Sequence, residues 1–124
     1  RGIAFEELCL QHISQIKYAL NIGGVSSQES SLIIKGNEEK DGMQIDLLID
    51  RADEVVNICE MKFYLSPYTI TKSYAQVLGS RLQAMQEKYP SKTFHLTYIG
   101  NTELTKNEYS DLFVSCVTLE ELFI

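Results

Sequence analysis

The chain has 124 residues, 44% of them hydrophobic, which is an ordinary composition for one globular domain. Its formal net charge of −6 counts against a protein that holds nucleic acid by electrostatic attraction alone, because such binding uses clustered lysine and arginine. No apolar run approaches the roughly 20 residues that a membrane helix needs, so no membrane partner is expected.

The three cysteines, Cys9, Cys59 and Cys116, are scattered and lack the CxxC spacing of zinc or redox motifs. A disulfide framework is therefore not expected, and we predict that each cysteine is a small buried hydrophobe in a cytoplasmic protein. The chain begins at Arg1 and runs directly into a predicted helix. We expect one domain over residues 1–124, cut from the C-terminus of a longer protein.

In the first part of the chain, residues 3–20 carry apolar side chains near the 3.6-residue period and predict one amphipathic helix. Residues 21–24 are expected to end it, with the glycines in the left-handed cap. A short strand is predicted over 30–35, followed by a polar turn between Gly36 and Gly42.

The rest of the chain alternates strands with one long helix. Strands are predicted over 43–51, 55–63, 93–99 and 113–117, a helix over 71–89, and a terminal helical turn over 119–124. This order of elements predicts an α/β domain in which helices flank a central mixed sheet.

The two strands 43–51 and 55–63 carry the informative polar residues. A hairpin centred on Asp53 places Asp46 opposite Glu60 and Gln44 opposite Lys62, with directly opposed Cβ atoms roughly 4.5–5.5 Å apart. Because side chains alternate between the two faces of a strand, the even-numbered residues are expected to share one face. These residues are 44, 46, 48, 56, 58, 60 and 62.

Two opposed carboxylates repel each other in a partly buried sheet, and a hard divalent cation removes that conflict. Carboxylate oxygens suit Mg²⁺ or Mn²⁺, which takes one or two protein carboxylates together with a substrate phosphate. The Lys62 ammonium is expected to orient or deprotonate an attacking water. Asp46, Glu60 and Lys62 therefore predict metal-dependent phosphodiester hydrolysis.

The stretches Gly42-Met-Gln-Ile-Asp46 and Ile58-Cys-Glu60-Met-Lys62-Phe63 resemble the PD-(D/E)XK phosphodiesterase superfamily. The resemblance implies a restriction-endonuclease-like αβββαβ core, the same order of elements that periodicity predicts. Within the superfamily, the chain is similar to nuclease-like domains at the C-terminus of bacterial and archaeal AAA-type ATPases. The implied partners are nucleic acid, most simply DNA, and an N-terminal ATPase domain.

The resemblance also implies roles for individual residues. Asp46 and Glu60 match the metal ligands and Lys62 the catalytic lysine, although Ile45 replaces the proline of the motif name. Many members add a glutamate on the first helix that reaches the metal through water, for which Glu6 is the first candidate and Glu7 the second. Further candidates for contacting substrate are Gln44, Lys72 and Gln76.

Two other interpretations remain open at this point. The nuclease fold can be retained as a catalytically silent interaction module of an AAA-type ATPase, which would suit the acidic net charge. Alternatively, Glu60 and Lys62 form an ordinary surface ion pair in a small α/β domain of unrelated function. Solvent exposure of Asp46 pointing away from Glu60 would favour the last of these.

Overall fold

The computed structural model describes residues 2–38 and 42–123 of the chain. Its elements follow the predicted order, with two short 3₁₀ helices, η1 and η2, beside the last strand. They are α1 (Gly2–Leu10), α2 (Ile13–Ala19), β1 (Ser27–Ile34), β2 (Met43–Arg51), β3 (Val55–Lys62), α3 (Lys72–Lys88), β4 (Thr93–Gly100), η1 (Ser110–Leu112), β5 (Phe113–Thr118) and η2 (Leu119–Phe123).

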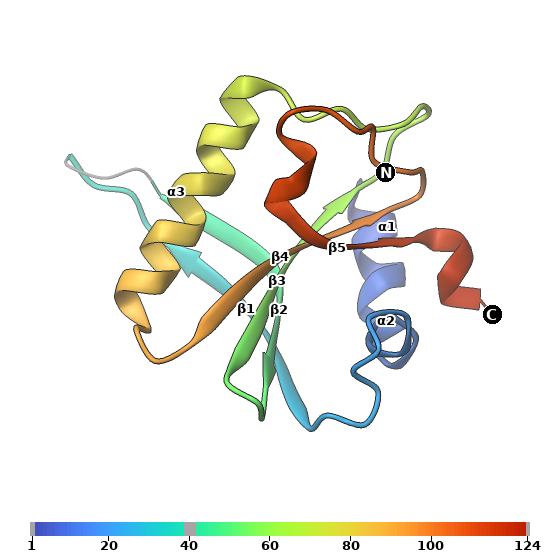
Figure 1. Ribbon diagram of the computed structural model, residues 1–124, viewed down its shortest axis with the longest axis horizontal. Helices are drawn as coiled ribbons and strands as arrows, with labels where there is room; N and C mark the ends of the chain where they lie inside the picture. Colours follow the sequence, from blue (N-terminus) through green and yellow to red (C-terminus); the bar gives the residue numbers. More distant parts are fainter. Residues whose placement is uncertain (1, 39–41, 124) are drawn as a thin grey trace.

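The five strands form one mixed sheet in the order β1-β2-β3-β4-β5. The first three strands pair antiparallel, whereas β3 with β4 and β4 with β5 pair parallel. Helix α3 makes the crossover between β3 and β4 and lies on one side of the sheet, while α1 and α2 lie on the other (Figure 1). The predicted α/β fold with a central mixed sheet flanked by helices is confirmed.

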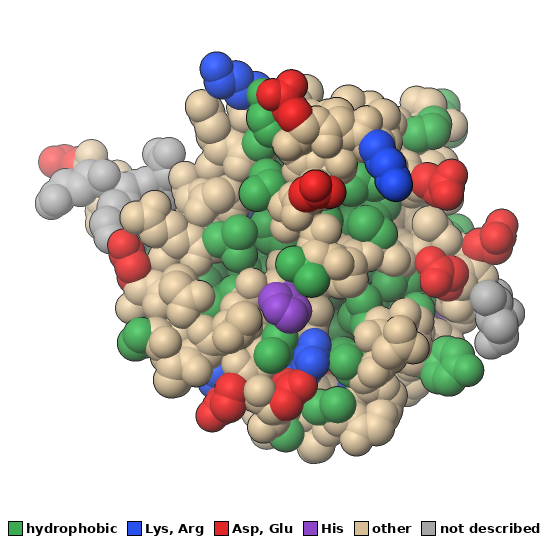
Figure 2. Space-filling model, viewed as in Figure 1, with side chains coloured by type: hydrophobic (Ala, Val, Ile, Leu, Met, Phe, Trp, Pro, Cys, Tyr) green, Lys and Arg blue, Asp and Glu red, His purple; other side chains and the backbone are tan. Residues whose placement is uncertain are grey.

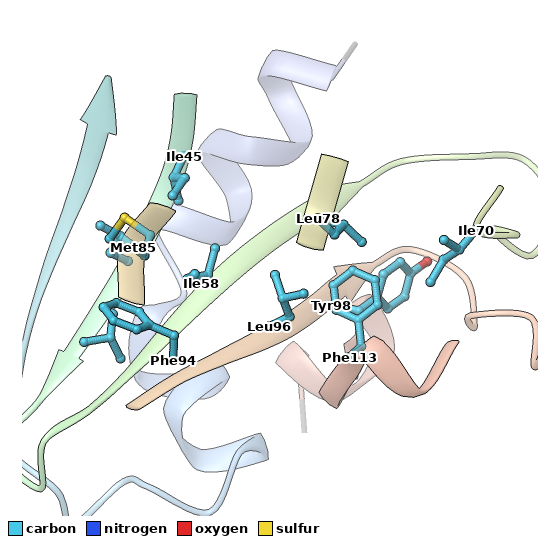
Figure 3. Packing of buried hydrophobic residues seen from close by; sticks show 11 residues of the cluster. Ile45, Ile58, Ile70, Leu78, Met85, Phe94, Leu96, Tyr98 and Phe113 are labelled. Carbon is cyan, nitrogen blue, oxygen red and sulfur yellow. The ribbon is translucent and has the colours of Figure 1, made fainter. Parts of the chain in front are cut away.

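A hydrophobic core fills each face of the sheet. On the α3 face, Leu78 and Met85 of the helix pack over strand residues such as Ile58 and Leu96, and Tyr98 and Phe113 close one end (Figure 3). On the α1 and α2 face, Phe5, Cys9 and Ile16 pack against residues that point the other way. Those strand residues are Leu47, Ile49, Cys59, Ile99 and Val117.

The predicted hairpin register is confirmed for the four pairs from Leu47↔Cys59 to Asp50↔Val56. The turn at residues 52–54 is also found, and Glu54 has a positive φ of 68° there. Among the described residues, however, the β2–β3 ladder includes neither the expected pair Asp46–Glu60 nor Gln44–Lys62. Both pairs lie beyond the last paired residues, toward the start of β2.

In the described part of the chain, the expected pairs are absent from the point where β2 has a bulge. Ser30 pairs with Leu48 and Leu32 pairs with Ile45, so two residues of β2, Asp46 and Leu47, oppose Ser31 alone. Because the extra residue reverses the alternation, Ile45 and Leu48 join the same core, whereas Leu47 lies in the opposite one. The prediction that all the even-numbered residues share a face is therefore wrong for the first half of β2.

The first predicted helix is two helices in the structure. α1 ends at Leu10 and α2 starts at Ile13, with His12 between them in a non-helical conformation. The His12 amide donates to the Cys9 carbonyl three residues back, and its ring lies 2.7 Å from the Leu8 carbonyl. The chain thus tightens and turns without glycine or proline, which the apolar period did not indicate.

Two smaller predictions also need correction. Asn21, with φ of 62°, takes the left-handed conformation after α2, and none of the described glycines has a positive φ. An asparagine can serve there because its short polar side chain tolerates this conformation. Cys9 and Cys59 are buried as predicted, but Cys116 is exposed.

β1 begins at Ser27, three residues before the predicted start. Part of the predicted turn over 36–42 lies outside the described residues. In the described ranges, no helix combines the length and the apolar character that crossing a membrane would require.

Candidate functional site

Asp46 lies on β2 at the bulge, where the strand leaves the β2–β3 ladder. Its carboxylate oxygen Oδ1 accepts a hydrogen bond of 2.8 Å from Nε2 of Gln44. The Asp46 side chain is partly buried, and Glu6 on α1 interacts with it directly. The bulge therefore brings a residue expected to lie with Glu60 into contact with the first helix.

Glu6 shares this place with Asp46. Partial burial raises the pKa of the Glu6 carboxyl, and the negative charge of Asp46 raises it further. A hydrogen bond between the two carboxyl groups also favours protonated Glu6, while the positive charge of Lys62 opposes these effects. Glu6, the first candidate on the helix, is thus close enough to Asp46 and Lys62 for their charges to affect its pKa. Glu7, the second candidate, is exposed.

Glu60 is buried on β3 and is held from α3. The Arg81 nitrogen Nη1 lies 2.7 Å from both carboxylate oxygens of Glu60, and the Tyr74 hydroxyl donates to Oε1 at 3.1 Å. Side-chain exposure is 9% for Glu60 and 22% for Arg81. Such a buried carboxylate needs a positive partner, and here the partner is a guanidinium.

Lys62 lies two residues after Glu60, with its ammonium against aromatic rings. Its Nζ lies 4.3 Å from the ring centre of Tyr74 and 5.5 Å from that of Tyr68. Burial lowers the pKa of the Lys62 ammonium, and the neighbouring Arg81 lowers it further. The charges of Glu60, Asp46 and Glu6 act in the opposite direction.

Tyrosines extend the wall beside Lys62. The Tyr68 ring lies 4.8 Å from that of Tyr64 and stacks on Tyr98 at 6.3 Å, measured between ring centres. The Tyr98 hydroxyl donates to the Thr102 carbonyl, and any Cβ on Gly100 would collide with that hydroxyl. The aromatic surroundings exclude water from one side of the ammonium, which accounts for the lowered pKa.

A cleft of about 820 Å³ opens between α3 and the facing ends of β1 and β2. Lys35 and Met43 lie on the strand side, and Gln76, Arg81 and Lys88 lie on the helix side. Among the described residues, the lining contains three basic residues, Lys35, Arg81 and Lys88, and one acidic residue, Glu87. Arg81 therefore belongs both to the cleft and to the ion pair with Glu60.

This local basic character contrasts with the rest of the surface. In Figure 2, Lys and Arg side chains lie at separate points on the face shown, with Asp and Glu side chains between them. The described residues on that face form no continuous basic stripe of the kind that tracks a phosphate backbone. Any phosphate-bearing ligand is therefore better served by the cleft than by that face.

Several of the residues selected from the sequence influence one another through their charges or contacts. Lys62 interacts electrostatically with Asp46, Glu60 and Glu6 at once, and Gln44 contacts Asp46. Gln76 lines the adjacent cleft. Lys72 is the exposed first residue of α3 and has no described contact with the carboxylates.

Sequence reasoning missed both Arg81 and Tyr74 as partners of Glu60. Tyr74, Leu78 and Arg81 follow the spacing i, i+4, i+7 and so share one face of α3. A cation on the buried stripe of a helix requires an acidic partner beneath it. That signal pointed to Arg81, although not to Glu60 in particular.

The donor set suits a hard divalent cation in its chemistry. Asp46 and Glu60 provide two carboxylates, the number that Mg²⁺ typically takes from a protein, and Glu6 provides a third nearby. In the part of the chain that is described, no three His, Cys, Asp or Glu side chains lie close enough together to hold a metal ion. Arg81 occupies both oxygens of Glu60 in this arrangement.

Comparisons with known proteins support the fold but give no information on activity. No protein-family model matches the chain, and no curated protein matches it. It is similar in structure to a crystallised protein of unknown function, AF1548, with a TM-score of 0.57 and 16% sequence identity. The match covers 90% of this chain and 63% of AF1548, so the chain spans less than two thirds of that protein.

Proposed function

We propose that this domain hydrolyses phosphodiester bonds in nucleic acid, most simply DNA, with Mg²⁺ or Mn²⁺ as cofactor. One observation supports the proposal most strongly: the Lys62 ammonium lies 4.3 Å from the ring centre of Tyr74, and the Tyr74 hydroxyl donates to Glu60, so the lysine and the glutamate of the motif lie around one tyrosine. A carboxylate and an amine beside one another are groups that a divalent cation and an attacking water can use.

The residues divide the chemistry between them in the proposed site. A divalent cation held by Asp46 and Glu60 would supply Lewis-acid activation of the phosphate and acidify a bound water. Lys62, with its lowered pKa, takes a proton from the attacking water or neutralises charge on the phosphate. Glu6 orients water beside Asp46, and Gln44 fixes the Asp46 carboxylate.

The charges of the cleft and of the whole chain bear on how the domain would hold nucleic acid. The cleft beside α3 offers Lys35, Arg81 and Lys88 to a phosphate backbone, with Gln76 between them. Since the chain as a whole carries −6, a partner would have to supply the remaining positive surface. The resemblance to nuclease-like domains of AAA-type ATPases suggests an N-terminal ATPase domain as that partner.

The proposal is tested by incubating the purified domain with DNA and Mn²⁺. Lys62→Met should lower the cleavage rate at least about 100-fold, the usual contribution of a general acid or base. Lys106→Met, at an exposed lysine in the loop after β4, is the matched control and should cleave normally. Equal cleavage by all three proteins would reveal a contaminant, and cleavage by none would contradict the proposal for the isolated domain.

A second candidate function is favoured by the ion pair between Arg81 and Glu60. Two contacts of 2.7 Å satisfy the carboxylate that the metal would need. A domain in which Arg81 always stays paired with Glu60 would serve as a catalytically silent interaction module of an ATPase. Calorimetry separates the two functions, because a silent module gives no Mn²⁺ binding that depends on Asp46.

A further inference from the structure

We propose that Arg81 is a displaceable internal counter-ion: it holds Glu60 until a divalent cation binds, and then turns into the cleft to bind substrate phosphate. This inference rests on the proposed function of the same site. It adds that the metal and the phosphodiester bind cooperatively. Arg81 must leave Glu60, where the metal binds, before it can reach the phosphate.

The geometry gives Arg81 two places to lie. Only one of its terminal nitrogens, Nη1, makes the two 2.7 Å contacts with Glu60, and the residue also lines the cleft. A guanidinium carries five N–H donors, so it is well suited to a second, bidentate partner such as a phosphate. Besides Arg81, the described lining of the cleft carries two basic residues, Lys35 and Lys88, and one acidic residue, Glu87, a balance that favours an anion there.

Charge balance favours the exchange. Glu60 and Arg81 are both mostly buried, so each compensates a charge that is largely shielded from bulk water. A divalent cation on Glu60 would repel a guanidinium that remains on the same oxygens, and the guanidinium cannot shed its proton. Released Arg81 is then a partly buried positive charge without a carboxylate, and a phosphate in the cleft restores the balance.

Cooperativity follows from this exchange. Metal binding alone must break the ion pair, so the wild-type protein binds Mn²⁺ weakly until a phosphate accepts Arg81. Thermodynamic linkage is reciprocal, so Mn²⁺ must strengthen phosphate binding by the same factor that phosphate strengthens Mn²⁺ binding.

Calorimetric titration of Mn²⁺, with and without a short phosphorothioate DNA duplex that resists cleavage, tests the inference. For the wild type, DNA should tighten Mn²⁺ binding about tenfold, within the usual range of coupling between sites. Arg81→Met should bind Mn²⁺ more tightly than the wild type without DNA, and DNA should tighten its affinity by a smaller factor than in the wild type. Arg51→Met, which breaks the arginine pair with Asp53 at the other end of β2, should behave as the wild type.

The outcomes separate this inference from the proposed function. Mn²⁺ binding that is equal in wild type and Arg81→Met, with equal responses to DNA, overturns the counter-ion role and leaves the nuclease proposal standing. Absence of Mn²⁺ binding in both proteins overturns the proposed function as well. Should Arg81→Met fail to fold, the wild type alone decides, because Mn²⁺ affinity that DNA does not alter overturns the inference.

Discussion

At the scale of single residues, the pKa values of Glu6 and Lys62 are shifted in the direction that disfavours their charged forms. Burial and the charge of Asp46 raise the pKa of Glu6, and burial lowers the pKa of Lys62. Each shift means that the folded state disfavours the charged form, so each charge lowers stability near neutral pH. Groups that cost stability in this way are typical of functional sites.

Glu6→Gln should make the domain more stable at pH 8 and change its stability little at pH 4. Because the folded pKa of Glu6 is raised, its protonated form contributes stability below the ordinary value of 4.5, and that contribution is lost as pH rises through the folded pKa. Glutamine keeps the hydrogen bond without the charge. Urea denaturation at both pH values measures the difference.

The adjacent residue provides the control for that experiment. Glu7 is exposed on the same helix, so Glu7→Gln should leave the pH dependence of stability as it is in the wild type. Identical pH profiles for Glu6→Gln and Glu7→Gln would contradict the assigned contact between Glu6 and Asp46.

At the scale of elements, α3 and the bulge in β2 place the side chains of the site. α3 carries Tyr74 and Arg81 over Glu60, and its first turn is fixed by Thr71, whose hydroxyl accepts from the Tyr74 amide at 3.2 Å. The bulge turns Asp46 toward α1 and Glu6. The site therefore depends on one cap and on one extra residue in a strand.

Thr71→Ala should lower the free energy of unfolding by about 1 kcal/mol, the usual loss when a helix N-cap is removed. Thr71→Ser keeps the accepting hydroxyl and should retain most of the stability. Urea denaturation followed by circular dichroism measures both variants. Equal losses in the alanine and serine variants would show that the methyl group, and not the cap, was responsible.

At the scale of the whole molecule, the sheet separates two cores that share its strands. Leu78 lies in the core on the α3 face and Ile16 in the core on the opposite face, and both side chains are fully buried. Neighbouring residues of one strand, such as Ile58 and Cys59, point into different cores. Loss of packing on one face must therefore weaken the other.

Leu78→Ala and Ile16→Ala should each lower the free energy of unfolding by about 2–5 kcal/mol, the range for truncating a buried aliphatic side chain. Each variant should still unfold in one transition, because both cores share the sheet. Thermal unfolding followed by far-UV circular dichroism and by tyrosine fluorescence tests this expectation. Val77→Ala, at the exposed neighbour of Leu78, is the control and should lose much less.

The elements themselves follow from the sequence, because their signals are local. The predicted bounds of β2 match the structure, and α3 starts and ends within one residue of the prediction. Apolar period, the Thr71 cap and Pro90 act over a few neighbouring residues, and a short turn fixes the register near Asp53. The break at His12 shows the limit of this approach, because the apolar period alone gave no sign of it.

What brings the site together was decided only by the tertiary structure. The sequence by itself indicated Asp46, Glu60, Lys62 and Glu6 as a set, but placed Asp46 directly opposite Glu60. The bulge depends on how β1 pairs with β2, and the contact of Arg81 with Glu60 depends on how α3 packs over β3. Both result from pairings between segments distant in the chain, where local periodicity carries no information.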